Sequence, residues 1–268
     1  MRPEDYPAQE PFSPPARLYH EEVMRRAPAI PGEELSYGSD PYQSVSIWRA
    51  ENPNSALLAF IHGGGWTNGY KEWMAFMAPA FIEAGISFAS VGYRLAPQHV
   101  FPSGFDDCCA GVAFVREHAR GFGADPARIF VGGHSAGGHY AALMALSRPD
   151  LGLRGCLPIS GVFDFGPQSE LKMRPRFLGP VEQAKEGPAS PIAQIGRKPG
   201  PFLIAHGSED FPHLMTQSVR MEDALRAAGG DVERLVLQGR DHFTASYAGG
   251  EPGGPWVPRA IEWIMRHE

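Results

Sequence analysis

The segment GHSAG at residues 133–137 is the clearest indication of the fold, because it joins an apolar run to a helix through a turn built around Ser135. The run Arg128–Gly132 precedes it, and the small and aliphatic residues of Gly138–Leu146 follow it. G-x-S-x-G between a strand and a helix is typical of a tight turn that strains the serine backbone and lifts its hydroxyl above a sheet. Free N–H groups at the start of the helix favour negative charge there. The alternative is a glycine-rich turn that only packs, but this order of elements favours a nucleophile.

Apolar runs alternate with helical patterns on both sides of this turn. The expected strands cover Leu35–Gly38, Gln43–Arg49, Ala56–Ile61, Ile86–Val91, Arg128–Gly132, Gly155–Ile159, Pro201–His206 and Val232–Leu237. The expected helices cover Arg17–Arg26, Trp73–Ala84, Asp106–Arg120, Gly138–Leu146, Met215–Ala228 and Pro258–Arg266. Buried runs that alternate with helices predict an α/β fold with a mostly parallel central sheet flanked by helices.

The chain of 268 residues is expected to form one domain, residues 1–268. Residues 1–34 are rich in proline and are interpreted as an N-terminal arm packed on that domain. Residues 161–199 carry several turn signals, so we expect them to be irregular and to form a small cap insertion over the site.

Composition excludes several classes of partner. The net charge is −6 and no basic cluster is present, so neither nucleic acid nor an anionic membrane surface is expected. No apolar run approaches the ~20 residues that a membrane helix needs, and the N-terminus lacks the apolar core of a signal peptide. The three cysteines, Cys108, Cys109 and Cys156, make a disulfide framework improbable, which favours a reducing cytoplasm.

A serine nucleophile needs a base and an acid, which follow it in chain order in this architecture. Asp210 comes after the strand Pro201–His206 and is the predicted acid. His242 comes after the strand Val232–Leu237 and is the predicted base. Glu209 and Asp164 are rival acids, and Asp210 could instead cap the following helix. The other histidines considered are packing, pocket or solvated residues: His139, His206, His213 and His267.

The oxyanion of the reaction needs preorganised donors. One donor is expected from the N–H of Ala136, and others from the loop His62–Trp66 after the strand Ala56–Ile61, where glycines let N–H groups turn inward. Three aromatic residues, Trp66, Tyr140 and Phe243, are predicted to line a substrate pocket suited to a flat leaving group. The alternative for each of them is packing in the core.

The loop His62–Gly65 together with Gly133–Gly138 resembles the α/β-hydrolase superfamily, in the branch that joins hormone-sensitive-lipase-type esterases and kynurenine formamidases. The resemblance runs from about residue 35 to the end of the chain. Segments similar to the esterase side are Tyr93–Pro97, Phe101-Pro102 and Asp106-Asp107; that side usually has aspartate in place of His134. Segments similar to the formamidase side are His134, Ser160–Asp164, Asp210–Pro212, Gln217-Ser218 and Asp241–Phe243.

The resemblance implies Ser135, Asp210 and His242 as a catalytic triad, with Gly64, Gly65 and Ala136 as oxyanion donors. It also implies no metal and no redox cofactor, and relatives often pair as homodimers. Residues 167–186 match neither side of the branch, and Phe211–Leu214 differs from the acidic, polar pattern expected of formamidases after the aspartate. We expect both segments to shape the acyl or leaving-group pocket.

Two functions from different classes follow. The first is a serine hydrolase that cleaves small-acyl carboxylic esters or N-formyl aryl amides through an acyl-enzyme. The second is a non-catalytic module on the same fold that binds a ligand or a partner. Because modules of that kind usually lack a triad member and this chain has all three, the sequence favours the hydrolase.

Overall fold

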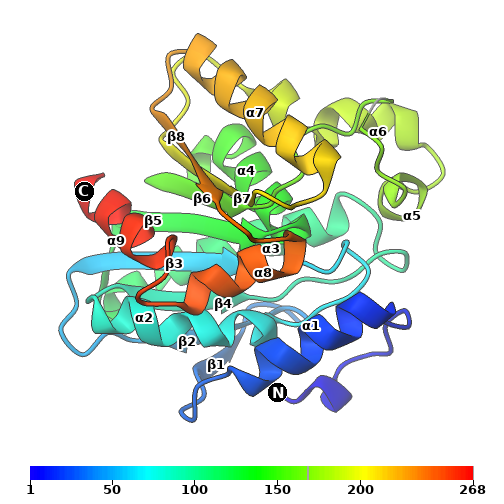
Figure 1. Cartoon of the computed structure of the whole chain (residues 1–268). Helices are drawn as coiled ribbons and strands as arrows, with labels where there is room; N and C mark the ends of the chain where they lie inside the picture. The colour runs from blue at the N-terminus through cyan, green and yellow to red at the C-terminus, as the bar shows by residue number, and fades with distance from the viewer. Residues whose placement is uncertain (168, 268) are drawn as a thin grey trace.

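The computed structural model describes residues 1–167 and 169–267 and contains one eight-stranded sheet (Figure 1). The strand order is β1-β2-β4-β3-β5-β6-β7-β8. The strands are β1 Glu33–Ser36, β2 Ser44–Trp48, β3 Ser55–Ile61, β4 Ser87–Val91, β5 Ala124–His134, β6 Gly155–Ile159, β7 Phe202–Gly207 and β8 Val232–Leu237. Strand β2 is antiparallel to β1 and β4, and the pairs from β4 to β8 are parallel. The predicted α/β fold with a mostly parallel sheet is therefore confirmed.

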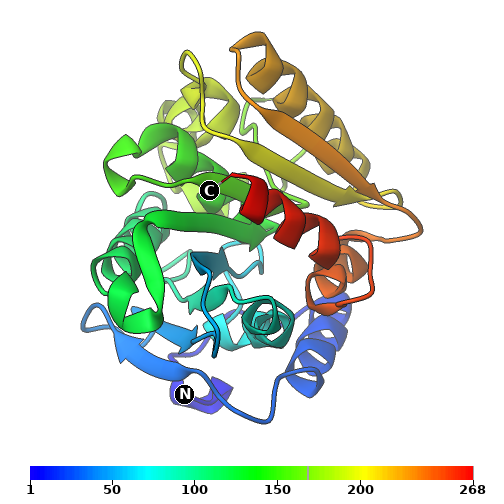
Figure 2. The ribbon, with the colours of Figure 1, turned by 90° about the vertical axis from the view of Figure 1, so that its left-hand side faces the viewer.

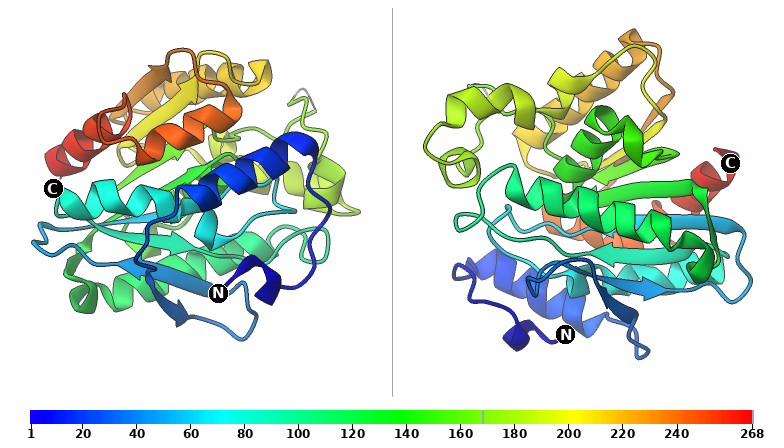
Figure 3. Two further views of the ribbon diagram at one scale, coloured as in Figure 1. Left: turned by 60° about the horizontal axis from the view of Figure 1, so that its bottom comes forward. Right: turned by 180° about the vertical axis from the view of Figure 1, so that it is seen from behind.

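Helices cover both faces of this sheet. The α-helices are α1 Pro14–Arg25, α2 Ala78–Glu83, α3 Ser103–Glu117, α4 Ala136–Ser147, α5 Arg174–Leu178, α6 Glu182–Ala189, α7 Pro212–Ala227, α8 His242–Tyr247 and α9 Val257–Arg266. The 3-10 helices are η1 Pro3–Asp5, η2 Lys71–Met77, η3 Ala119–Phe122, η4 Pro149–Leu151, η5 Pro191–Gln194 and η6 Ala248–Gly250. Helices α3 and α4 lie on one face, and α1, α2, α8 and α9 lie on the other (Figure 3).

The strands at the centre of the sheet are apolar where both of their faces are covered. Every residue of β3 from Ala56 to Ile61 has no exposed surface, and the same holds for the segment Ile129–Val131 of β5. The sheet twists from β1 and β2 toward β7 and β8 (Figure 2), as is usual for neighbouring strands of L-amino acids. This continuous core holds the ends of β3, β5, β7 and β8 at one edge.

Three segments differ from the elements expected. The predicted helix Trp73–Ala84 is divided into η2 and α2, because Pro79 has no N–H to continue the α-helical hydrogen bonds. The segment 161–199, expected to be irregular, contains the short helices α5 and α6. Helix α8 was not predicted, although Asp241 begins it with a side chain that accepts the Thr244 N–H at 2.8 Å.

The first 34 residues lie against the body of the protein through α1. Tyr19 of α1 is buried and contacts the Trp73 ring edge-on, with 5.2 Å between the centroids. Nearer the N-terminus, the buried Lys71 ammonium donates to the Tyr6 hydroxyl at 2.8 Å and to the Glu72 carboxylate at 2.6 Å. These contacts hold the N-terminal segment in place beside η2.

Residue 168 of the predicted cap insertion and residue 268 of the predicted domain lie outside the described residues. Among the helices that are described, none is both long and apolar enough to cross a bilayer. The thiols of Cys108, Cys109 and Cys156 are free and buried.

Candidate active site

Ser135 occupies a strained turn between β5 and α4. Its backbone has φ 55° and ψ −116°, a conformation that non-glycine residues rarely adopt. The turn also requires glycine at position 137, where a Cβ atom would lie 2.0 Å from the carbonyl oxygen of Ile61. The Ser135 N–H donates to the Ile159 carbonyl at 2.9 Å, so the hydroxyl is fixed at the first turn of α4.

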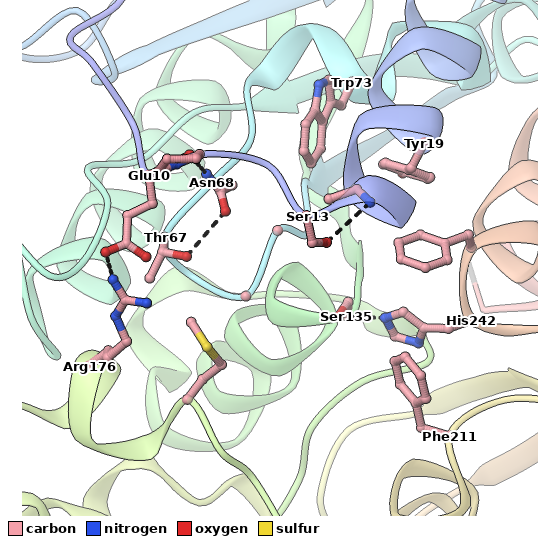
Figure 4. Close-up of a pocket in the computed structure, with 16 residues that line it drawn as sticks. Glu10, Ser13, Tyr19, Thr67, Asn68, Trp73, Ser135, Arg176, Phe211 and His242 are labelled. Atoms are coloured by element: carbon pink, nitrogen blue, oxygen red, sulfur yellow. Dashed lines mark hydrogen bonds and ion pairs between the residues drawn. The ribbon is translucent and has the colours of Figure 1, made fainter.

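Three residues from the ends of β5, β7 and β8 form one hydrogen-bonded chain. The distance from Ser135 Oγ to His242 Nε2 is 3.0 Å (Figure 4), and that from His242 Nδ1 to Asp210 Oδ1 is 2.8 Å. His242 and Asp210 are 7% and 3% exposed. The structure therefore brings together the three side chains predicted from the chain order, in the geometry that a base-activated serine needs.

The Asp210 carboxylate is held in its ionised form. Burial by itself raises its pKa, but hydrogen bonds from His242, from the Ser160 hydroxyl and from the Phe211 N–H outweigh burial and lower the pKa to about 2. Ser160 directly follows β6 and is fully buried. Sequence reasoning placed Ser160 only in a formamidase-like segment and did not predict this contact with Asp210.

His134 supports the base from the other side. Its Nε2–H donates to the carbonyl oxygen of His242 at 2.9 Å, and its ring centroid lies 4.8 Å from that of His242. His134 is 2% exposed, and burial together with the neighbouring imidazole lowers its pKa to about 3. A neutral His134 thus positions the backbone of His242 without adding a charge to the site.

The glycine loop, His62–Gly65 after β3, lies beside Ser135, and two of its glycines line the same cavity. Gly64 has φ 108°, and a Cβ atom there would lie 2.0 Å from the carbonyl oxygen of Asn68, so only glycine fits. Among the described residues, the N–H groups of Gly64, Gly65 and Ala136 donate no recorded hydrogen bond to the rest of the chain. All three predicted donors are thus unengaged, and Gly64 and Gly65 line the same cavity as Ser135.

A cavity of about 460 Å³ opens beside Ser135. Its lining comes from the N-terminal segment, the glycine loop, the 161–199 segment and the loops that carry the acid and the base: Glu10, Pro11, Ser13, Ala16, Tyr19, Gly64, Gly65, Thr67, Asn68, Trp73, Ser135, Met173, Arg176, Phe211, His242 and Phe243. Phe243 lies where it was predicted. The lining by residues before position 20 was not predicted, because nothing in the sequence places that segment over the site.

The prediction that Trp66 and Tyr140 line this pocket is wrong. Trp66 is 3% exposed, stacks on Phe177 with 4.3 Å between the ring centroids and donates its indole N–H to His139. Tyr140 is 2% exposed and packs edge-on against Tyr93. Both side chains fill the core beneath the 161–199 segment, which is the packing alternative considered for them.

Among the described residues, none of the rival acids and histidines hydrogen-bonds to the Ser135 hydroxyl, whose partner is His242. Glu209 is exposed, and Asp164 pairs with Arg220 at 2.9 Å. Three of the other histidines considered hydrogen-bond to backbone carbonyl oxygens: His139 to that of Ala189, His206 to that of Gly207, and His267 to that of Trp263. The fourth, His213, stacks on the ring of Phe211.

Comparisons with known proteins agree with this fold. The sequence pattern of the BD-FAE family matches residues 47–159, which include the glycine loop and the Ser135 turn. Esterase LipC of Mycobacterium tuberculosis is 30% identical over 248 residues, covering 82% of this chain and 61% of that protein. The probable isoprenylcysteine alpha-carbonyl methylesterase ICME of Oryza sativa subsp. japonica is 29% identical over 234 residues, covering 77% of this chain and 56% of that protein.

Solved structures of esterases have the same fold. A bacterial heroin esterase superimposes with a TM-score of 0.73 at 25% identity, covering 95% of this chain and 91% of the other. An arylesterase superimposes with a TM-score of 0.74 at 20% identity, covering 96% and 91% of the two chains. The chain belongs to the α/β-hydrolase esterase family. It spans between 56% and 61% of the length of the two sequence relatives named above.

Proposed function

We propose that this protein is a serine esterase that hydrolyses carboxylic esters through an acyl-enzyme, with Ser135 as nucleophile, His242 as base and Asp210 as acid. The observation that carries the proposal is the hydrogen-bonded chain from Ser135 Oγ through the His242 ring to Asp210, with 3.0 Å and 2.8 Å between the paired atoms, at the wall of a cavity. The esterase relatives support the same class of reaction.

In the proposed reaction each of these groups has one role. Ser135 Oγ attacks the ester carbonyl carbon while His242 Nε2 takes the hydroxyl proton, and ionised Asp210 stabilises the imidazolium that forms. The carbonyl oxygen becomes an oxyanion that accepts hydrogen bonds from the N–H groups of Gly64, Gly65 and Ala136. The imidazolium then protonates the departing alcohol. Water next attacks the acyl carbon while His242 takes its proton, the bond from that carbon to Ser135 Oγ breaks, and His242 returns the proton to Oγ as the acid leaves.

We also propose how the domain is organised around the cavity. In a single domain of residues 1–268, residues 1–34 act as an arm and residues 161–199 as a cap, and each contributes side chains to the cavity. Arg176 of the cap and Glu10 of the arm form an ion pair over the cavity, which supports a shared role of the two segments in enclosing substrate.

Replacement of Ser135 by alanine tests the proposal. The variant should retain the far-ultraviolet circular dichroism of the wild type, because Ala adds no bulk to the turn, and should lose nearly all hydrolysis of p-nitrophenyl acetate. A folded Ser135→Ala protein that hydrolyses this ester at the wild-type rate would contradict the assignment of the nucleophile.

The formamidase alternative uses the same residues on an N-formyl aryl amide. It is supported by the sequence segments around His134, Ser160 and Gln217, whereas the relatives named above are esterases. Parallel rate measurements on N-formylkynurenine and on short p-nitrophenyl esters separate the two. We expect the esters to be turned over faster, and equal or faster turnover of N-formylkynurenine would replace the esterase assignment with the formamidase one.

A further inference from the structure

The identity of the leaving group can be inferred from the side chains around His242, provided that the proposed esterase mechanism holds. In that mechanism the departing oxygen takes its proton from His242 Nε2. The leaving group therefore lies next to the imidazole, and the residues in contact with that ring form its subsite.

Aromatic side chains surround the His242 imidazole. The Phe211 ring lies 4.7 Å from it between centroids, with 30° between the planes, and the Phe243 ring lies 5.6 Å from it, nearly perpendicular. The wall continues into the N-terminal segment, where Tyr19 lies 5.6 Å from Phe243 and 5.2 Å from Trp73. All four aromatic residues line the cavity.

Phe211 differs from the other three because its ring is accessible. It is 45% exposed, although it directly follows the buried Asp210. The ring of His213 is nearly parallel to that of Phe211, with 5.8 Å between the centroids, and stacks against it. The main-chain N–H of Phe211 donates to Asp210 Oδ1 at 2.7 Å, so the backbone of the acid loop fixes where the ring stands. An accessible, supported aromatic face beside the base is suited to stack on a flat apolar group.

The opposite end of the cavity is polar. Thr67, Asn68 and the Arg176–Glu10 ion pair lie there, across the glycine loop from His242 (Figure 4). The cavity is therefore divided into an aromatic end next to the base and a polar end distant from it. An aryl group gains more contact at the aromatic end, where leaving groups depart.

We propose that Phe211 is a specificity-determining residue that selects esters with an aromatic leaving group. As Ser135 Oγ forms its bond to the carbonyl carbon and the tetrahedral intermediate collapses, the bond from carbon to the aryl oxygen breaks. The electron pair goes to that oxygen, which takes the proton from His242 Nε2. The Phe211 ring stacks on the departing aryl ring during this step.

The test compares phenyl acetate with ethyl acetate in wild type, Phe211→Leu and Phe211→Tyr, with acid release followed in a pH-stat. Leucine keeps apolar volume and the backbone hydrogen bond but removes the ring, and tyrosine keeps the ring. For each ester the rate of a variant is divided by the rate of wild type, so the intrinsic reactivity of the ester cancels. We expect Phe211→Leu to lower kcat/KM for phenyl acetate about 3- to 10-fold, on the scale of an aromatic pair, with ethyl acetate changed less than twofold.

Two controls accompany this comparison. Phe211→Tyr should retain the wild-type preference for phenyl acetate. Val219→Ala should change neither rate, since Val219 is an exposed apolar side chain of α7 that is not among the residues lining the cavity. An equal loss on both esters in Phe211→Leu would show that the ring only holds His242, and an unchanged preference would show that it does not contact the leaving group. Either result overturns the proposal.

Binding separates this proposal from the esterase assignment. If wild type hydrolyses neither ester, the proposed function fails, and the subsite is then tested by titrating phenyl acetate into Ser135→Ala and into Ser135→Ala/Phe211→Leu, followed by ligand NMR. Weaker binding of phenyl acetate to the double variant supports the subsite, and equal binding to the two proteins overturns it.

Discussion

Lowering the pH from 8 to 5.5 should destabilise the fold by about 4 kcal/mol, because three histidines are buried in neutral form. Burial lowers the pKa of His62 to about 4 and those of His134 and His139 to about 3, from 6.5. For His139, the hydrogen bonds of the ring also oppose a second proton. His139 Nδ1 accepts the Trp66 indole N–H at 3.1 Å while its Nε2–H donates to the Ala189 carbonyl, so a proton on Nδ1 would oppose a donor.

The magnitude follows from proton linkage. Below pH 6.5 the unfolded chain binds a proton at each of these histidines and the folded chain does not, so stability falls with pH until the folded-state values near 4 and 3 are reached. At pH 5.5, one unit below the unfolded-state pKa, each histidine costs about 1.4 kcal/mol, and three cost about 4 kcal/mol. The lowered pKa of Asp210, about 2, acts only below about pH 4 and so adds nothing in this interval.

The assay is urea unfolding followed by circular dichroism at pH 8.0, 6.5 and 5.5. The control is His139→Gln, which removes one of the three groups and should reduce the loss between pH 8 and 5.5 to about 3 kcal/mol. A free energy of unfolding that stays constant or rises as the pH falls to 5.5 would contradict the assignment of three neutral histidines, since it would mean that the folded protein takes up these protons.

Substitutions at three residues test the groups around the proposed catalytic residues, and kcat and KM on p-nitrophenyl acetate are measured for each variant. Ser160→Ala removes a donor from the Asp210 carboxylate and should lower kcat about 10-fold or more, as hydrogen bonds to charged groups do; unchanged kcat would mean that this bond does not orient the acid. His134→Ala should lower kcat about 10-fold by releasing the His242 backbone, and His134→Gln, which keeps an N–H donor, should recover much of it; equal activity of the two would disprove a positioning role. Gly64→Ala places a Cβ atom against the Asn68 carbonyl and should lower kcat about 10²- to 10³-fold by displacing an oxyanion donor; a fully active variant would exclude Gly64 from that role.

The meeting of Ser135, Asp210 and His242 could be predicted from sequence because three local patterns determine it. A parallel sheet brings the carboxyl ends of its strands to one edge, so Ser135, Asp210 and His242 could be chosen by the strand that each follows. The glycine loop after β3 was recognised in the same way. These predictions required only the order of strands along the chain and no knowledge of side-chain packing.

The pocket could not be predicted, because its walls come from segments without strand or helix periodicity. Trp66 directly follows the glycine loop and was expected in the cavity, but Phe177 of α5 covers its ring. Nothing in the sequence fixes where Phe177 packs. Tyr19 likewise reaches the site only because α1 lies across η2. Such contacts depend on long-range packing, which hydrophobic periodicity does not encode.

The hydrogen bonds that hold His242 and Asp210 in place could not be predicted from the sequence either. His134 and Ser160 were noted for their motifs, yet their partners, the His242 backbone and the Asp210 carboxylate, lie 108 and 50 residues further along the chain. Only the folded arrangement shows that the turn bearing the serine also holds the base.

The most direct test of the central claim is reaction of the protein with a fluorophosphonate, followed by peptide mass spectrometry. An activated serine hydroxyl displaces fluoride and keeps the phosphonyl group. We expect one phosphonyl group per chain, attached to Ser135, and none on Ser135→Ala. Absence of labelling, or labelling at another residue, would contradict an activated Ser135 and would favour a binding module instead.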